Sequence, residues 1–130
     1  MSTGKNILII DDERLVTKSL QKLLAREGYN VVIAASGKEA VEKFKNSEFD
    51  LIVSDVRMPG MDGIETIEKI RLMQKERGLD CIPEILITGF ANEESYNKAL
   101  KLKVADYIFK PFDSKQFLDA IKRNLHVETE

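Results

Sequence analysis

Short apolar runs alternate along the chain with longer stretches in which apolar residues recur at helical spacing. The run ILII at 7–10 is too short for a helix and rich in β-branched residues, so it predicts a strand. Comparable runs predict strands at 31–35, 51–53, 84–88 and 105–109. Because these runs are apolar throughout and do not alternate, they predict a parallel sheet covered on both faces.

Amphipathic segments between these runs predict five helices. Ser36 is a suitable N-cap for the second helix, and Gly28 is a suitable stop for the first. The helices are marked by Leu15 to Leu24, by 36–46, by Ile64 to Ile70, by 92–102 and by Phe117 to Leu125. The chain therefore consists of five strand–helix units, with no internal repeat or linker.

Composition limits the classes of function. The chain has 130 residues, 43% of them hydrophobic, which fits one domain over 1–130 with a core of about 5–125. A net charge of -2 and the short apolar runs disfavour binding to nucleic acid or to a membrane, and no signal peptide is evident, so we expect a cytoplasmic protein. Cys81 and His126 are single, which excludes an internal disulfide and disfavours a histidine-based triad or metal site.

Polar residues follow four of the five predicted strands. They are the pairs Asp11-Asp12, Ser54-Asp55, Thr88-Gly89 and Lys110-Pro111. The carboxyl ends of parallel strands share one edge of the sheet, where such folds bind ligands. If the sheet is doubly wound, the first and third strands are neighbours, and three carboxylates converge at that edge.

Three close carboxylates repel one another, and a cation relieves that repulsion. Mg²⁺ fits, because it accepts one or two carboxylates and keeps several waters. Lys110 and Thr88 would add an ammonium and a hydroxyl at the same edge. Such a set can hold a phosphoryl group, and a carboxylate can be its acceptor.

Each of these residues also has a simpler interpretation. Asp12 could only cap the first helix, Thr88 could only favour a strand, and Lys110 could be a solvated surface residue. Tyr107, in the fifth predicted strand, could equally be a core aromatic residue or a residue that changes position as part of a switch. A carboxylate such as Asp55 directly after a buried strand is costly unless it is used or paired, which favours the functional interpretation.

The same residues carry a family resemblance. Asp11-Asp12, the run VSDVRMPGMDG around Asp55, Thr88-Gly89 and the run ADYIFKPF around Lys110 resemble the receiver domains of bacterial two-component response regulators. The resemblance extends from Lys5 to about Leu125. It implies an α/β, flavodoxin-like fold: a doubly wound five-stranded parallel sheet of order 2-1-3-4-5, flanked by five helices.

The resemblance also implies roles for the site residues. Asp55 would be the phosphoacceptor, and Mg²⁺ would be bound by Asp55, directly by Asp12, largely through water by Asp11, and by the backbone carbonyl of Arg57. The phosphoryl group would contact Thr88 and Lys110.

Further residues would adjust the site and transmit its state. Tyr107 would be the switch aromatic, which turns inward when Thr88 moves. The Lys110-Pro111 bond would be cis, and Gly89 would leave the site open to phosphate. The distance along the chain from Asp55 to Thr88 is slightly long for the family, and we expect the excess in a loop over 74–82, away from the site.

These assignments predict a phosphorylation-activated signalling switch of a two-component system. A sensor histidine kinase would donate the phosphoryl group, and Asp55 would be modified and reset by self-catalysis without enzymatic turnover. The face of the fourth helix, fifth strand and fifth helix would then bind a downstream effector, an output domain or a second copy; it should carry Glu94, Lys98, Lys101 and Asp106.

Two other functions are compatible with parts of the pattern. The first is a metal-dependent phosphatase or phosphotransferase that forms an aspartyl phosphate, although Asp11 and Asp12 are adjacent and no insertion could form a cap over a substrate. The second is a receiver-like protein that binds partners without phosphorylation, which the complete set of site residues disfavours.

Overall fold

Five strands and five helices alternate in the structure, a computed structural model that describes residues 3–89 and 93–125. The strands are β1 (Asn6–Ile10), β2 (Asn30–Ala34), β3 (Leu51–Asp55), β4 (Glu84–Thr88) and β5 (Asp106–Phe109). The helices are α1 (Arg14–Arg26), α2 (Gly37–Asn46), α3 (Gly63–Glu76), α4 (Glu93–Leu102) and α5 (Ser114–Asn124). The predicted order of elements is confirmed. Among the described residues, no helix is long and apolar enough to cross a membrane.

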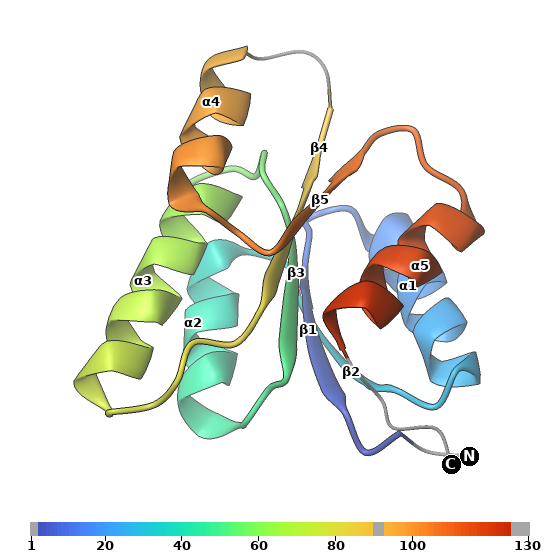
Figure 1. Cartoon of the computed structure of the whole chain (residues 1–130), viewed down its shortest axis with the longest axis horizontal. Coiled ribbons are helices and arrows are strands. Elements are labelled where there is room, and N and C mark those ends of the chain that lie inside the picture. Colours follow the sequence, from blue (N-terminus) through green and yellow to red (C-terminus); the bar gives the residue numbers. More distant parts are fainter. Residues whose placement is uncertain (1–2, 90–92, 126–130) are drawn as a thin grey trace.

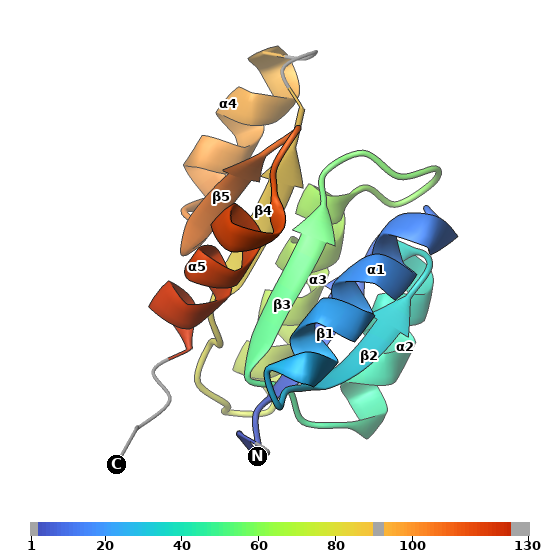
Figure 2. The same cartoon turned by 90° about the vertical axis from the view of Figure 1, so that its right-hand side faces the viewer.

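The strands form one parallel sheet in the order β2-β1-β3-β4-β5, which confirms the predicted doubly wound topology. Helices α2, α3 and α4 cover one face, and α1 and α5 cover the other (Figures 1 and 2). Alternate residues of β1 serve the two faces: Ile7 and Ile9 pack with Phe117 of α5, whereas Leu8 and Ile10 pack in the cluster under α2. Burial on both faces explains why the inner residues of the strands are apolar and do not alternate with polar ones.

The strands match their predicted ranges to within two residues at each end, and two of the differences place Ala35 just after β2 and Ala105 just before β5. Ser36 is the N-cap of α2, as predicted, and accepts a hydrogen bond from the N–H of Glu39 at 3.1 Å. The Glu39 carboxylate in turn accepts one from the N–H of Ala35 at 2.9 Å, so this reciprocal cap takes Ala35 out of β2. Ala105 donates its N–H to the carbonyl of Glu84 at 2.9 Å just before β5 begins.

The connection from α3 to β4 begins later than expected. The sequence predicts a loop over 74–82, but α3 continues to Glu76, and Gln74 is a buried helical residue. The chain turns at Gly78, where φ is 68°. This connection lies at the opposite end of the sheet from the carboxyl ends of the strands, so it does not disturb the predicted site (Figure 1).

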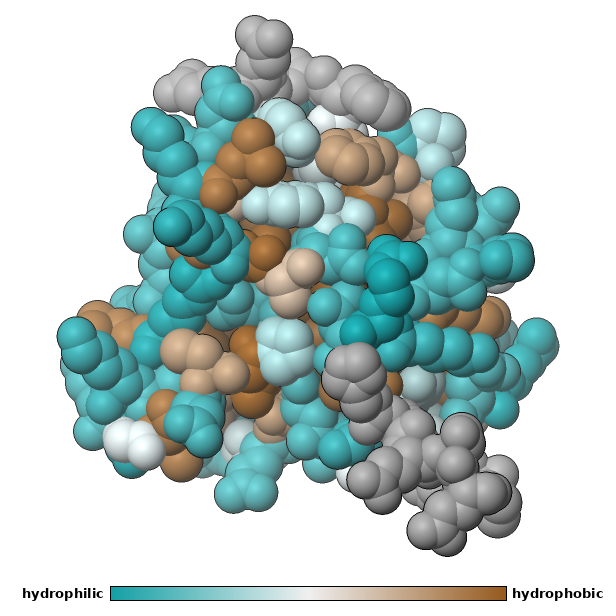
Figure 3. All heavy atoms as spheres, viewed as in Figure 1, coloured by the Kyte–Doolittle hydropathy of each residue, from teal (hydrophilic) through white to brown (hydrophobic). Residues whose placement is uncertain are grey.

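Hydrophilic side chains cover most of the face shown in Figure 3, and hydrophobic residues form small patches between them. The exposed large hydrophobic residues of the described ranges come from separate segments: Leu15, Leu72, Leu79, Leu100 and Phe109. Cys81 is exposed, as its predicted place in a loop requires. His126 lies outside the described residues.

Candidate functional site

Three carboxylates meet at the carboxyl end of the sheet. Asp11 and Asp12 directly follow β1, and Asp55 is the last residue of β3. Because β1 and β3 pair side by side, with Ile10 opposite Ser54, the three carboxylates converge, and one oxygen of each lies within 4.8 Å of the others. Asp11 is 3% exposed and Asp55 is 5% exposed, whereas Asp12 faces solvent.

The environment of Asp11 is the least favourable of the three for a negative charge. Its Oδ1 accepts a hydrogen bond from the N–H of Glu13 at 3.0 Å, but its buried Oδ2 has no partner among the described residues. Burial, reinforced by the charge of Asp55, raises the pKa of Asp11 to about 6 despite the lowering effects of that hydrogen bond and of Lys110. Asp11 is therefore poorly satisfied without a cation.

The capping role considered for Asp12 is wrong. The N-cap of α1 is Glu13, which makes no side-chain cap. The backbone N–H of Glu13, at this helix start, instead donates to Oδ1 of Asp11. The side chain of Asp12 is therefore available at the site.

Lys110 reaches the same cluster from the end of β5. Its Nζ lies 3.3 Å from Oδ2 of Asp55, so the interpretation of a purely solvated lysine is wrong. Burial and the charge of Asp12 raise the pKa of Asp55, and Lys110 lowers it in part, with a net rise. The Lys110-Pro111 peptide bond is cis, as predicted. The N–H of Lys110 donates to the carbonyl of Thr88 at 2.8 Å, which ties the ends of β4 and β5 together.

Among the described residues, no hydrogen bond or ion pair joins Thr88, Arg57 or Tyr107 to this cluster. Thr88 is buried at the end of β4, one register position beyond the pair Asp55–Ile87, and its hydroxyl donates to the carbonyl of Gly89 at 3.2 Å. Arg57 is exposed. The parts of Thr88 in phosphoryl binding and of the Arg57 carbonyl in metal binding stay predictions.

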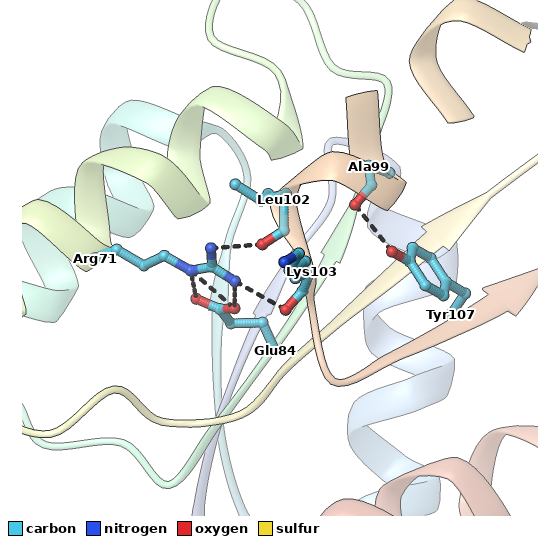
Figure 4. Close-up of polar contacts among 6 residues, drawn as sticks. All are labelled: Arg71, Glu84, Ala99, Leu102, Lys103 and Tyr107. Carbon is cyan, nitrogen blue, oxygen red and sulfur yellow. Dashed lines mark hydrogen bonds and ion pairs between the residues drawn. The ribbon is translucent and has the colours of Figure 1, made fainter. Parts of the chain in front are cut away.

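Tyr107 is directed toward α4. It is half-buried, and its hydroxyl donates to the carbonyl of Ala99 at 2.9 Å (Figure 4). Its ring lies edge-on to that of Tyr96, with the ring centroids 6.2 Å apart. Its role as a switch stays a prediction.

Gly63 contributes to the site in a way that the sequence did not reveal. A Cβ at this position would lie 2.1 Å from the carbonyl oxygen of Asp55 and 2.9 Å from Oγ of Ser54. The only sequence signal was its place after Asp62, which caps α3 by accepting from the N–H of Glu65 at 2.8 Å. In contrast, a Cβ at Gly89 would meet no atom of the described residues within 4 Å.

The architecture and the carboxylate cluster match a known family. The family model for the response regulator receiver domain matches residues 7–122. This chain belongs to the response regulator receiver domain family. As a receiver domain, it is a phosphorylation-activated signalling switch of two-component systems. Receiver domains are generally not classed as enzymes, and no comparison supports the phosphatase alternative.

Relatives in sequence and structure agree with this assignment. The transcriptional regulatory protein ZraR of Escherichia coli K12 is 39% identical over 108 residues, which cover 83% of this chain but only 23% of that protein. The chemotaxis protein CheY of Treponema pallidum is 37% identical over 118 residues, covering 88% of this chain and 78% of that protein. The structure of Vibrio cholerae CheY4 has a TM-score of 0.83 at 28% identity, covering 93% of this chain and 98% of that one. The chain thus spans about a quarter of the ZraR proteins.

Proposed function

We propose that Asp55 is the residue phosphorylated in this receiver domain and that Mg²⁺ is bound by Asp11, Asp12 and Asp55 with the carbonyl of Arg57. The observation that carries the proposal is the convergence of the three carboxylates, since one oxygen of each lies within 4.8 Å of the others. Three carboxylates against the ammonium of Lys110 leave a local excess of negative charge, which a divalent cation would offset. The unpartnered Oδ2 of Asp11 is the kind of oxygen that a hard cation binds.

The protein groups have distinct parts in phosphoryl transfer. A carboxylate oxygen of Asp55 would attack the phosphorus of a phosphohistidine; the new P–O bond forms as the P–N bond breaks, and the electron pair stays on the imidazole nitrogen. Lys110, already 3.3 Å from Asp55, would contact an oxygen of the arriving group, and Thr88 would donate its hydroxyl to another. Bound Mg²⁺ would supply neutralisation of the negative charge that accumulates there.

The partners follow from the family. We propose a sensor histidine kinase as donor and a downstream effector or output domain as the reader of the phosphorylated state, on the face of α4, β5 and α5; a second copy bound after phosphorylation is the alternative reader. Lys98, Lys101 and Asp106 lie on these elements, whereas the side chain of Glu94 is outside the described part of the chain. We also propose, from the sequence, that the chain is one domain over 1–130 and that the protein is cytoplasmic.

Mass spectrometry of the intact protein tests the assignment of Asp55. With acetyl phosphate and Mg²⁺, the wild type should gain one phosphoryl group, and it should gain none when EDTA replaces Mg²⁺. Asp55→Asn should gain none in either case. Asp80→Asn, which changes an exposed aspartate in the loop before β4, is the matched control and should be labelled like the wild type. Labelling that persists in Asp55→Asn would show that the acceptor is elsewhere.

A further inference from the structure

Arg71 of α3 joins three elements through one guanidinium group (Figure 4). Its Nε lies 3.0 Å from Oε2 of Glu84, and its Nη2 lies 2.6 Å from Oε1, so the pair is bidentate. Its Nη1 donates to the carbonyl of Leu102 at 2.6 Å, and Nη2 also reaches the carbonyl of Lys103 at 3.4 Å. Glu84 is the first residue of β4, and Leu102 is the last residue of α4. The cation therefore lies on the C-terminal carbonyls of α4, where the helix dipole favours it.

Neighbouring contacts fix the same end of α4. The chain leaves the helix through Lys103, whose φ is 55°. Val104 is buried in the cluster that contains Leu86 of β4, and Ala105 donates its N–H to the carbonyl of Glu84 at 2.9 Å. The C-terminal end of α4 is thus held to both α3 and β4.

The side chain of Tyr107 also binds the last turn of α4, through a single hydrogen bond from its hydroxyl. The N–H of Lys103 donates to the carbonyl of Leu100, three residues back, at 3.2 Å. The carbonyl of Ala99, which a regular helix would pair with that N–H, instead accepts the hydroxyl of Tyr107 at 2.9 Å. Tyr107 is therefore a side-chain cap of α4 as well as the predicted switch residue.

The two tethers differ in strength. Glu84 is 3% exposed, so separating it from Arg71 would leave a buried carboxylate unpaired, and charge-assisted bidentate bonds are roughly twice as strong as neutral ones. The bond from Tyr107 to Ala99 joins neutral groups, and Tyr107 is only half-buried. A change at the site would release Tyr107 first.

The arrangement of β4 connects these tethers to the site. Glu84, Leu86 and Thr88 alternate along the strand and so share one face, on which Leu86 packs with Ala99 of α4. Four residues of strand at about 3.3 Å each separate Glu84 from Thr88 by roughly 13 Å. The fixed end of α4 is thus at the start of β4, and Thr88 is at the opposite end of the strand, next to the phosphorylation site.

We propose that the Arg71–Glu84 pair is a fixed pivot at the C-terminal end of α4 and that Tyr107 is a releasable second tether, so that α4 turns about this end when Tyr107 leaves Ala99. The proposal rests on the proposed function in one respect: phosphorylation of Asp55 supplies the release. Displacement then increases along α4 away from Leu102, and the last turn stays in place.

Hydrogen exchange in the unphosphorylated protein tests the tethers, followed by NMR at single amides. Arg71→Lys keeps a positive charge near Glu84 but lacks the fork that reaches the carbonyls of α4. Tyr107→Phe removes only the hydroxyl. Tyr107→Phe should lower the protection of the last turn of α4 by about tenfold, the loss expected for one such hydrogen bond, and Arg71→Lys should lower it further because its contacts are the stronger ones. Arg77→Lys, an exposed arginine near the end of the same helix α3, is the matched control and should leave that turn unchanged.

Beryllofluoride with Mg²⁺, a phosphoryl mimic, then tests the pivot. In the wild type the amide shift changes should diminish from Tyr96 to Lys103, and in Arg71→Lys they should extend to Leu102 and Lys103. Equal changes along the whole helix of the wild type, or unchanged exchange in Arg71→Lys, would overturn the proposal.

Two controls keep the outcomes separate. If Arg71→Lys does not fold, Arg71→Met combined with Glu84→Met removes the pivot without leaving a buried charge unpaired, and it should show the same loss of protection. Failure of beryllofluoride to bind at Asp55 would refute the proposed function, whereas the exchange measurements still decide the tethers.

Discussion

Asp11 should destabilise the metal-free protein, and replacing it with asparagine should make that protein more stable. Its pKa rises from 3.8 to about 6, chiefly because burial disfavours the charged form. The folded chain therefore binds a proton at this carboxyl more tightly than the unfolded chain does. The stability that comes from protonating Asp11 in the folded chain is fully present below about pH 4 and is lost as the pH rises through about 6. A pKa difference of two units corresponds to about 3 kcal/mol of this stability.

Asp11→Asn removes the charge and keeps an oxygen that can accept the N–H of Glu13, which Asp11 binds at 3.0 Å. We expect the variant to be more stable by about 1–3 kcal/mol at about pH 7.5 with EDTA. The gain should shrink by about 2 kcal/mol at about pH 4.5, because the wild type is largely protonated there in its folded state. Urea unfolding of both proteins at both pH values measures these differences.

Asp80→Asn is the control, because this exposed side chain should change stability by less than about 0.5 kcal/mol at either pH. Added Mg²⁺ should stabilise the wild type and not Asp11→Asn, so that the two curves approach one another. A variant less stable than the wild type in EDTA, or a gain of the same size at both pH values, would refute the reasoning.

Three further changes test the surrounding structure by urea unfolding. Gly63→Ala should destabilise the protein by about 3 kcal/mol, because its Cβ would lie 2.1 Å from the carbonyl oxygen of Asp55. Gly89→Ala should change the stability by less than about 0.5 kcal/mol. Equal effects of the two substitutions would contradict the geometry. Burial raises the pKa of Asp106, but hydrogen bonds, led by the one from Arg123, lower it overall. Asp106→Ala should therefore lower the free energy of unfolding by about 1 kcal/mol near neutral pH and by less below about pH 4, where the carboxyl is protonated. An equal loss at both pH values would refute this. Ser36→Ala should lose about 1 kcal/mol with the N-cap of α2, and no loss would contradict the cap.

Much of the fold was predictable because the hydrophobic pattern has few solutions. Runs such as 7–10 are buried on both faces, and only a parallel sheet covered by helices on both sides explains that. Element boundaries were less predictable, because they depend on side chains that compete for backbone groups. Ala35 lies outside β2, since Glu39 binds its N–H, and Gln74 is a buried residue of α3, which continues to Glu76.

Within the site, the convergence of Asp11, Asp12, Asp55 and Lys110 was predictable, because each lies at the carboxyl end of a strand. The contact of Gly63 with the Asp55 carbonyl was not, because it depends on the path of the loop between them.

The Arg71–Glu84 pair also could not be predicted from the sequence, because it depends on tertiary packing. Glu84 is the first residue of β4 and is followed by three apolar residues, and a buried carboxylate needs a partner. The sequence offers several lysines and arginines as partners for Glu84. The packing of α3 against β4 and α4 determines that the partner is Arg71.

The two ends of β4 therefore have opposite energetic characters. At the carboxyl end, Thr88 adjoins carboxylates whose charges are poorly satisfied in the metal-free protein, so a cation or a phosphoryl group can change the balance there. At the other end, Glu84 is fully paired with Arg71, and any movement that separated them would be strongly disfavoured. A change that starts at Thr88 can then displace α4 only by breaking its weaker contact, the one through Tyr107. The direction of the response follows from this contrast: the part of α4 nearest the site moves, and the part nearest Arg71 does not.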